Sequence, residues 1–276
     1  MATWLITGCS TGLGRALAVA VLDRGENAIV TARDVTRVED IAAGHPENAL
    51  AVALDVTDSA QIAEAVKLGT EKFGQIDVLV NNAGYGYRAA VEEGDAADVR
   101  ALFDTHFFGS ADMIKAVLPQ MRARRSGTIV NLSSIGARAN PAGSGYYSAV
   151  KCAIEGLTGS LRKELAPLGI TAMVVEPGGF RTDFAGRSLT QSTTVIDDYA
   201  DTAGKRRKEN DATHGTQPGD PTKAAQAIIA AVEAADTPEM LVLGTDAVAV
   251  FRAALEAQLA SLEDWRAVGE STDIDE

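Results

Sequence analysis

The sequence predicts an α/β fold: a doubly wound, mostly parallel sheet of seven strands with helices on both faces. Short apolar segments of strand-like composition alternate with segments of helical spacing, which is the order of repeated βαβ units. A glycine-rich loop joins the first strand to the first helix. The 276 residues, 46% of them apolar, suffice for one large core, so we expect a single domain over residues 1–276.

The first half of the chain supplies four of the strands. An apolar strand at 4–7 is followed by helical spacing at 14–24, where Gly25 is a typical helix C-cap. Further strands are predicted at 27–32, 49–54 and 78–80. Because helical spacing follows the second and third strands, we expect the sheet to be parallel.

The second half continues this order. Its predicted elements are helical spacing at 95–125, a strand at 128–132, a helix at 147–166, and strands at 170–175 and 240–243. Asp220 and Pro221 have the pattern of an N-cap and a first-turn proline that open a helix to residue 235. A closing helix begins at Asp246 and ends in an acidic tail, 270–276, which we expect to fray.

The net charge of −13 at pH 7 argues against nucleic acid or an anionic membrane surface as a partner. No run of 18 apolar residues occurs, and the first residues pass directly into a strand without the regions of a secretory leader. We therefore expect a cytoplasmic protein that binds neither nucleic acid nor membrane, and we assign no metal site.

Residues 134–151 have the pattern of an acid-base site. Tyr147 and Lys151 are four apart in a helical segment, which places their Cβ atoms about 5 to 6 Å apart on one face. The phenol has an ordinary pKa of about 10, and a nearby ammonium should lower this pKa toward neutrality. Ser134 follows the strand at 128–132, at the edge where open α/β sheets bind ligands.

Two further motifs support a nucleotide site. The loop Thr-Gly-Cys-Ser-Thr-Gly-Leu-Gly at 7–14 lies between a strand and a helix, where glycines allow a close backbone approach and the helix N-terminus faces a pyrophosphate. No Gly-Lys-Ser/Thr follows, which disfavours a nucleotide triphosphatase. The segment Asn-Asn-Ala-Gly at 81–84 follows the fourth strand.

In this order, T-G-x-x-x-G-x-G, N-N-A-G, S and Y-x-x-x-K resemble the single-domain branch of the short-chain dehydrogenase/reductase superfamily. The resemblance covers nearly the whole chain and implies a Rossmann-like fold, a nicotinamide cofactor and a homodimer or homotetramer. It also implies that the protein reduces a ketone or aldehyde to an alcohol, or runs the reverse reaction. Tyr147 would give the proton, Ser134 would hold the carbonyl oxygen, and Lys151 would tune the phenol and bind the nicotinamide ribose.

The resemblance assigns cofactor contacts to the three motifs and to a Pro-Gly-x-x-x-Thr segment after the sixth strand. These residues are Gly8, Ser10, Thr11, Gly12, Leu13, Gly14, Arg33, Asp55, Val56, Asn82, Ala83, Gly84, Tyr147, Lys151, Pro177, Gly178 and Thr182. Asp55 could instead cap a helix, and we assign Asn81 a structural role between strands. Neighbouring Ser133 and Tyr146 are also expected to be structural.

The end of the second strand predicts the choice of cofactor. An acidic residue there binds the ribose 2′-hydroxyl of NAD, whereas an arginine accommodates the 2′-phosphate of NADP. The aligned position is Ala32, followed by Arg33. We therefore predict that NADP(H) is preferred, with NAD(H) still possible if Asp34 reaches the ribose.

His106 stands where the family carries a catalytic Asn, which holds a water in a proton path to the tyrosine. Imidazole can also bind a water through a ring nitrogen, and Lys151 and burial should keep it neutral. Alternatively, His106 only packs between Phe103 and Phe107. We favour the relay because His106 occupies the motif position, and we count it with the catalytic residues.

The polar segment at 183–219 is long for a connection in a compact domain, so it is either a functional lid or a disordered insertion. Its position directly after the Pro-Gly-x-x-x-Thr segment at 177–182, which in the family covers the nicotinamide, favours a helical substrate lid. The basic run at 205–208 could bind an anionic substrate, but such a run is more often a solvated helix face, and we adopt that interpretation.

The substrate is the least determined feature. The branch most similar to this chain contains 17β-hydroxysteroid and retinol dehydrogenases, and an apolar pocket wall is expected from Tyr85, Tyr87, Phe180 and Phe184. A non-catalytic NADP(H)-sensing binding protein of the same fold is an alternative, which the intact Ser134, Tyr147 and Lys151 disfavour. A sugar-nucleotide epimerase would have a different glycine spacing and a larger substrate domain.

Overall fold

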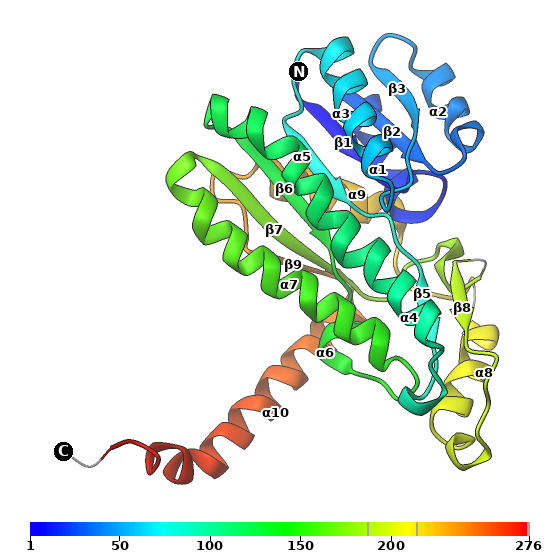
Figure 1. Cartoon of the computed structure of the whole chain (residues 1–276), viewed down its shortest axis with the longest axis vertical. Helices are drawn as coiled ribbons and strands as arrows, with labels where there is room; N and C mark the ends of the chain where they lie inside the picture. Colours follow the sequence, from blue (N-terminus) through cyan, green and yellow to red (C-terminus); the bar gives the residue numbers. More distant parts are fainter. Residues whose placement is uncertain (187, 214, 275–276) are drawn as a thin grey trace.

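A computed structural model describes residues 1–186, 188–213 and 215–274. Its central sheet has seven strands, all parallel, in the order β3-β2-β1-β4-β6-β7-β9 (Figure 1). The strands are β1 (Thr3–Ile6), β2 (Asn27–Ala32), β3 (Ala49–Ala53), β4 (Val78–Asn81), β6 (Gly127–Leu132), β7 (Ile170–Pro177) and β9 (Met240–Leu243). The strand order changes direction between β1 and β4, which is where doubly wound sheets open a ligand crevice.

Two hydrophobic clusters hold helices to the two faces of this sheet. One face packs on α1 (Gly12–Asp23), α2 (Glu39–Gly44) and α9 (Pro221–Glu233). The other packs on α3 (Ser59–Phe73), α5 (Gly109–Arg124) and α7 (Gly145–Leu165). Trp4 and Ile6 of β1 belong to the first cluster and Leu5 to the second, so both faces of the strand are buried. This is why the strands read as continuous apolar runs.

The helical segment predicted at 95–125 is interrupted. It forms α4 (Ala96–Phe103), a π-helical turn η3 (Asp104–Phe108) and then α5. Between β6 and α7 lies the short helix α6 (Gly136–Ala139). Short 3₁₀ turns lie between the longer elements: η1 (Val35–Arg37), η2 (Val91–Glu93), η4 (Ala166–Leu168), η5 (Asp183–Ala185) and η6 (Asp197–Tyr199). Asp220 caps α9 by accepting a bond from Thr222 N at 2.8 Å, as predicted.

The segment at 183–219 contains regular structure. Its strand β8 (Leu189–Gln191) pairs in parallel with β5 (Gly86–Arg88), and its helix α8 (Ala203–Thr213) lies beside this small sheet (Figure 1). The basic run in α8 is not uniformly solvated: Arg206 and Arg207 are half-buried, and Arg207 forms an ion pair with the buried Glu93. The prediction of a solvated face is therefore wrong for these two residues.

The last helix, α10 (Thr245–Glu270), projects away from the rest of the molecule (Figure 1). Its beginning packs on α6, where Phe251 lies 5.2 Å from the Arg138 guanidinium. Exposed apolar side chains follow along it: Val248, Val250, Leu255, Leu259, Leu262, Trp265 and Val268. Of the predicted frayed tail, Glu270 ends this helix and 275–276 lie outside the described residues. None of the described helices is long and apolar enough to cross a membrane.

Candidate active site

A cleft of about 1110 Å³ opens along the carboxyl ends of the central strands. It runs from the glycine loop, past the ends of β2 and β4, to α7, β7 and the segment at 183–219. This volume exceeds that of most pockets for one small ligand, so it accommodates a dinucleotide together with a substrate. All the predicted catalytic and cofactor residues line it except Gly14.

Asn82 and Thr7 shape the glycine loop. The backbone N–H groups of Asn82 and Ala83 each donate to Thr7 Oγ1 at 2.9 Å, and Asn82 Nδ2 donates to the Thr7 carbonyl at 2.8 Å. A Cβ atom at Gly14 would lie 2.3 Å from Asn82 Nδ2, so Gly14 allows the loop to pack rather than facing the cleft. The cofactor contact of Gly14 stays a prediction.

The glycine loop has the geometry of a pyrophosphate site. Gly8 and Gly12 have φ values of +73° and +63°, which favour glycine. Helix α1 begins at Gly12, and the side chain of its N-cap, Thr11, makes no capping hydrogen bond. The first-turn N–H groups therefore face the cleft without a side-chain cap, as anion binding at a helix N-terminus requires.

One end of the cleft lies at the ends of β2 and β3, where the adenosine of the cofactor is predicted, and is called the adenosine end below. Ala32, Arg33, Asp34 and Arg37 line it. The Asp34 carboxylate accepts bonds from Thr36 N at 3.1 Å and Thr36 Oγ1 at 2.7 Å, and these bonds lower its pKa. The Asp34 carboxylate is thus hydrogen-bonded within its own turn.

Asp55 also lines this end of the cleft. Its carboxylate accepts bonds from Thr57, whereas Asp58 caps α3 through Ala60 N and Gln61 N. The alternative of a helix cap at Asp55 is wrong.

Asn81 bonds to Asn131 across β4 and β6 at 2.8 Å, which confirms its structural position.

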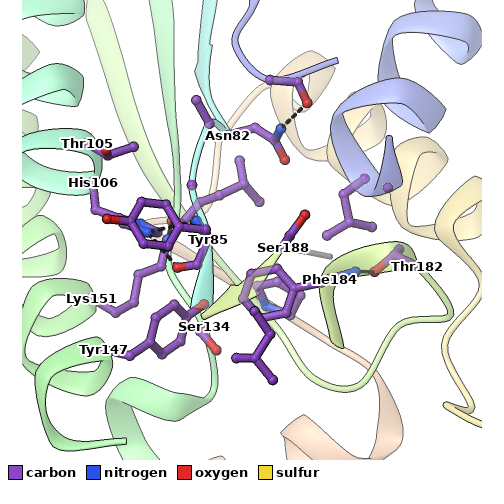
Figure 2. Close-up of a pocket in the computed structure, with 18 of the residues that line it drawn as sticks. Asn82, Tyr85, Thr105, His106, Ser134, Tyr147, Lys151, Thr182, Phe184 and Ser188 are labelled. Carbon is purple, nitrogen blue, oxygen red and sulfur yellow. Dashed lines mark hydrogen bonds between the residues drawn. The ribbon is translucent and has the colours of Figure 1, made fainter. Parts of the chain in front are cut away.

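Ser134, Tyr147 and Lys151 converge at the middle of the cleft (Figure 2). Ser134 follows β6, and its Oγ accepts a bond from Gly136 N at 3.1 Å. Tyr147 and Lys151 are one turn apart on α7, and Lys151 Nζ lies 5.7 Å from the centre of the phenol ring. Lys151 Nζ donates to the Leu132 carbonyl at 2.7 Å, which ties α7 to the end of β6.

Burial controls the acid-base properties of this group. It raises the pKa of Tyr147, an effect that a hydrogen bond to Ser134 and the charge of Arg88 only partly offset. It also lowers the pKa of Lys151 to about 7, against a smaller opposing effect of Glu155. The expectation that the pKa of Tyr147 falls toward neutrality is therefore wrong, because desolvation of the phenol outweighs the hydrogen bond and the nearby charge.

His106 lies in the π-helical turn η3, only 4% exposed. Its Nε2 is 3.0 Å from Tyr85 N and 2.8 Å from Tyr85 O, and its buried Nδ1 has no partner among the described residues. Burial and, to a lesser extent, the charge of Lys151 lower its pKa well below 6.5. The ring contacts the rings of Tyr85 and Tyr147, so packing between Phe103 and Phe107 does not describe its environment.

The Pro-Gly-x-x-x-Thr segment at 177–182 closes the far side of the cleft. Gly178 N donates to Leu243 O at 2.8 Å, and Thr182 caps η5 through Phe184 N. The Phe184 ring centre is 5.9 Å from that of Tyr147 (Figure 2). Tyr85, Phe180 and Phe184 line the cleft as predicted, whereas Tyr87 is 1% exposed and belongs to a separate core cluster.

The two neighbours of the acid-base group have other partners. Ser133 Oγ donates to the Glu155 carboxylate, and Tyr146 Oη donates to the Val91 carbonyl at 2.6 Å. Neither side chain is therefore available to replace Ser134 or Tyr147.

Comparison with known proteins identifies the family. The short chain dehydrogenase family profile matches residues 2–193. The chain belongs to the short-chain dehydrogenase family. The oxidoreductase BOA17 of Botryotinia fuckeliana is 40% identical over 264 residues, 95% of this chain and 96% of that protein. Human retinol dehydrogenase 8 is 38% identical over 196 residues, 68% of this chain and 62% of that protein.

A crystal structure of a short-chain dehydrogenase from Streptomyces avermitilis has a TM-score of 0.92 to this chain at 42% identity. The match covers 99% of this chain and 98% of that one. The predicted superfamily and Rossmann-like fold are confirmed, and the chain is an oxidoreductase of this family.

Arg88 is a residue of the cleft in this short-chain dehydrogenase that was not predicted from the sequence. It is the last residue of β5, 8% exposed, and it lines the cleft near Tyr147. A strand of three residues has no measurable periodicity, and its partner β8 lies about a hundred residues away. The only signal was an arginine close behind Asn-Asn-Ala-Gly in an otherwise apolar and glycine-rich stretch.

Proposed function

We propose that the protein is an NADP(H)-dependent carbonyl reductase that converts a ketone or aldehyde to an alcohol, or catalyses the reverse reaction. The observation that carries this proposal is the convergence of Ser134, Tyr147 and Lys151 on a cleft that also reaches the glycine loop. Substrate and dinucleotide can therefore meet at the phenol.

A bound reduced nicotinamide would supply the hydride to the carbonyl carbon. Tyr147 donates its phenolic proton to the carbonyl oxygen, and its raised pKa keeps it protonated at neutral pH. Ser134 Oγ accepts from Gly136 N, so its own proton can point at the same oxygen and stabilise the developing charge. In alcohol oxidation, Tyr147 acts as the base.

Lys151 supports the phenol from one turn along α7. The bond from Nζ to the Leu132 carbonyl holds the ammonium beside the ring, where it stabilises the phenolate left after proton transfer. The remaining Nζ protons can bind the nicotinamide ribose. Burial lowers the pKa of Lys151 to about 7, so this lysine can gain or lose its proton near neutral pH.

Charge at the adenosine end supports a preference for NADP(H) over NAD(H). Ala32 offers no carboxylate to a ribose 2′-hydroxyl, and Arg33 and Arg37 line the cleft beside it. Asp34, the one acidic residue that follows β2 directly, is held by Thr36. Two guanidinium groups without a free carboxylate suit a 2′-phosphate.

Two structural features extend the proposal. The unpartnered Nδ1 of His106 can bind a water next to Lys151 and so take over the role of the family's Asn. The segment at 183–219 contributes Phe184, Ser188 and Leu189 to the cleft, which supports a substrate lid. The likeness to retinol dehydrogenase 8 supports a substrate with an apolar portion beside its carbonyl or hydroxyl group.

A homo-oligomer and a cytoplasmic location stay predictions. The projecting helix α10 supports the first, because Val248, Leu255, Leu259, Leu262 and Trp265 follow helical spacing along one exposed stripe. A second copy of the chain could cover this stripe with its own α10.

The direct test measures NADPH and NADH oxidation over a panel of ketones and aldehydes, and NADP and NAD reduction over the matching alcohols. Dinucleotide binding is followed in parallel by NADPH fluorescence. Turnover with Ser134→Ala reduced at least tenfold supports the proposal. Tight NADPH binding without turnover of any compound would instead identify the non-catalytic cofactor-sensing protein.

A further inference from the structure

Arg88 is a buried charge that the described protein does not neutralise. Its Nη1 donates only to the Tyr87 carbonyl, at 3.5 Å, and its Nε is buried without a partner. Within the described ranges no carboxylate forms an ion pair with it. A buried guanidinium without a counter-charge is costly, so a ligand that supplies the charge would relieve a penalty built into the fold.

The neighbouring Arg207 shows how the same fold treats a structural arginine. Its guanidinium is paired with the buried Glu93, whose carboxylate also accepts bonds from Ala90 N at 2.8 Å and Ile196 N at 2.9 Å. This cluster joins η2 to the segment at 183–219. Arg88 lies close by on β5 but takes no part in the cluster.

The ionisable groups that shift the pKa of Arg88 belong to residues that line the cleft. Arg206 of α8 lines the same cleft, and its charge adds to burial in lowering the pKa of Arg88 to about 10, so Arg88 is cationic at neutral pH. Tyr147 is the other group coupled to it. The acidic residues Asp98 and Asp104 at the cleft act on Tyr85. Arg88 thus acts on the phenol, and a second cation from another element, Arg206, acts on Arg88.

We propose that the substrate carries an anionic group, a carboxylate or a phosphate, which Arg88 binds while the carbonyl lies at Tyr147. This inference rests on the proposed carbonyl reduction. A guanidinium binds either anion through two parallel hydrogen bonds, and the low exposure of Arg88 strengthens the pairing. Arg206 supplies a second cation from the lid, and Phe184 and Leu189 offer an apolar wall to the rest of the molecule.

The test compares substrates that differ only in charge. Straight-chain keto acids with the ketone at increasing distance from the carboxylate are each paired with their methyl ester. Dihydroxyacetone phosphate is paired with dihydroxyacetone, which separates phosphate from carboxylate recognition. We expect kcat/KM with NADPH to be at least tenfold higher for the charged member of one pair, and equal values in every pair would overturn the proposal.

Variants locate the anion site. Arg88→Gln should reduce the charged-to-neutral ratio of kcat/KM by about 10- to 100-fold, the size of a lost charged hydrogen-bonded contact. The ratio isolates anion binding, because any change in the pKa of Tyr147 affects both members of a pair equally. Arg88→Lys should keep part of the ratio, and Arg206→Gln should lower it. Lys205→Gln, an exposed charge on the same helix, is the matched control. An unchanged ratio in Arg88→Gln would refute the assignment.

A binding measurement separates this inference from the proposed reaction. The complex of Tyr147→Phe with NADP is titrated with each keto acid and its ester by calorimetry. Selective binding of the acid that is lost on Arg88→Gln supports the anion site even if the parent reduces none of the compounds, in which case only the proposed reaction fails. Equal binding of acid and ester removes the anion site whatever the turnover.

Discussion

The ring of His106 meets the ring of Tyr147 edge on, with centroids 5.9 Å apart and an interplanar angle of 89°. Gly84 makes this approach possible, because a Cβ atom there would lie 2.3 Å from His106 Cε1. The last glycine of Asn-Asn-Ala-Gly therefore sets the position of the imidazole behind the phenol. The π-helical turn that carries His106 is of a kind often found at functional sites.

Replacement of His106 tests the proton relay. His106→Asn should keep substantial activity, whereas His106→Leu should lower turnover severalfold or more because no ring nitrogen remains to bind a water. Since the pKa of His106 is lowered, the ring is neutral at neutral pH and its protonation should inhibit the parent only well below pH 6.5. The pH dependence of kcat for the parent and His106→Asn would show this inflection lost in the variant. If His106→Leu matches the parent in turnover and pH dependence, with an unchanged circular dichroism spectrum, His106 is not catalytic.

Tyr147→Phe should nearly abolish turnover, with a loss of at least about 10² to 10⁴, because only the ionisable hydroxyl is removed. Affinity for NADPH, measured by fluorescence titration, should stay within about twofold of the parent. Tyr146→Phe is the matched control, since the Tyr146 hydroxyl bonds to the Val91 carbonyl outside the acid-base group. Turnover of Tyr147→Phe close to the parent rate would exclude the phenol as the proton donor.

Cofactor preference should depend on the end of β2. The parent should have the higher kcat/KM with NADPH, and Ala32→Asp should shift the preference toward NADH by placing a carboxylate at the ribose. Arg33→Gln should weaken NADPH use by about 10- to 100-fold through loss of a charged contact, with little effect on NADH. Equal kcat/KM for the two dinucleotides in the parent would contradict the prediction.

Lys151 should lower the stability of the fold at neutral pH. Its folded pKa of about 7 lies below the ordinary 10.5, so the unfolded chain binds more protons between these values and stability rises with pH across this window. Lys151→Met removes the buried charge and this rise. Its gain in unfolding free energy over the parent should be largest at pH 7 and below, and should shrink by about 1.4 kcal/mol for each pH unit toward pH 10.

Urea unfolding at pH 7 and pH 10 without cofactor measures this difference. Lys163→Met, an exposed lysine on the same helix, should show no comparable change between the two pH values. A Lys151→Met variant whose stability relative to the parent is independent of pH would show that Lys151 keeps an ordinary pKa.

Helix α10 should mediate self-association. Sedimentation velocity of the parent at micromolar concentration should show a dimer or tetramer, and Leu259→Glu with Leu262→Glu should shift it toward a smaller species by placing charge on the exposed apolar stripe. Ala260→Glu adds one charge to the same helix off the stripe and should leave the assembly unchanged. A parent that sediments as a monomer, or a double variant that sediments like the parent, counts against α10 as the interface.

Much of this protein could be predicted from sequence alone. Buried parallel strands are apolar throughout, so the seven strands of the sheet are visible as short apolar runs even without their partners. The spacing of four between Tyr147 and Lys151 places both on one helix face, and Ser134 follows its strand directly. These are local relationships, and local backbone geometry is enough to determine them.

Tertiary structure decided the features that depend on distant contacts. Arg88 faces the cleft because β5 pairs with β8, and two three-residue strands a hundred residues apart leave no pattern in the sequence. Arg206 and Arg207 turn inward because α8 packs beside that sheet, although a basic run by itself predicts a solvated face. The pKa of Tyr147 rises rather than falls because its environment is assembled from several segments of the chain, and the cost of desolvating a phenolate depends on all of them.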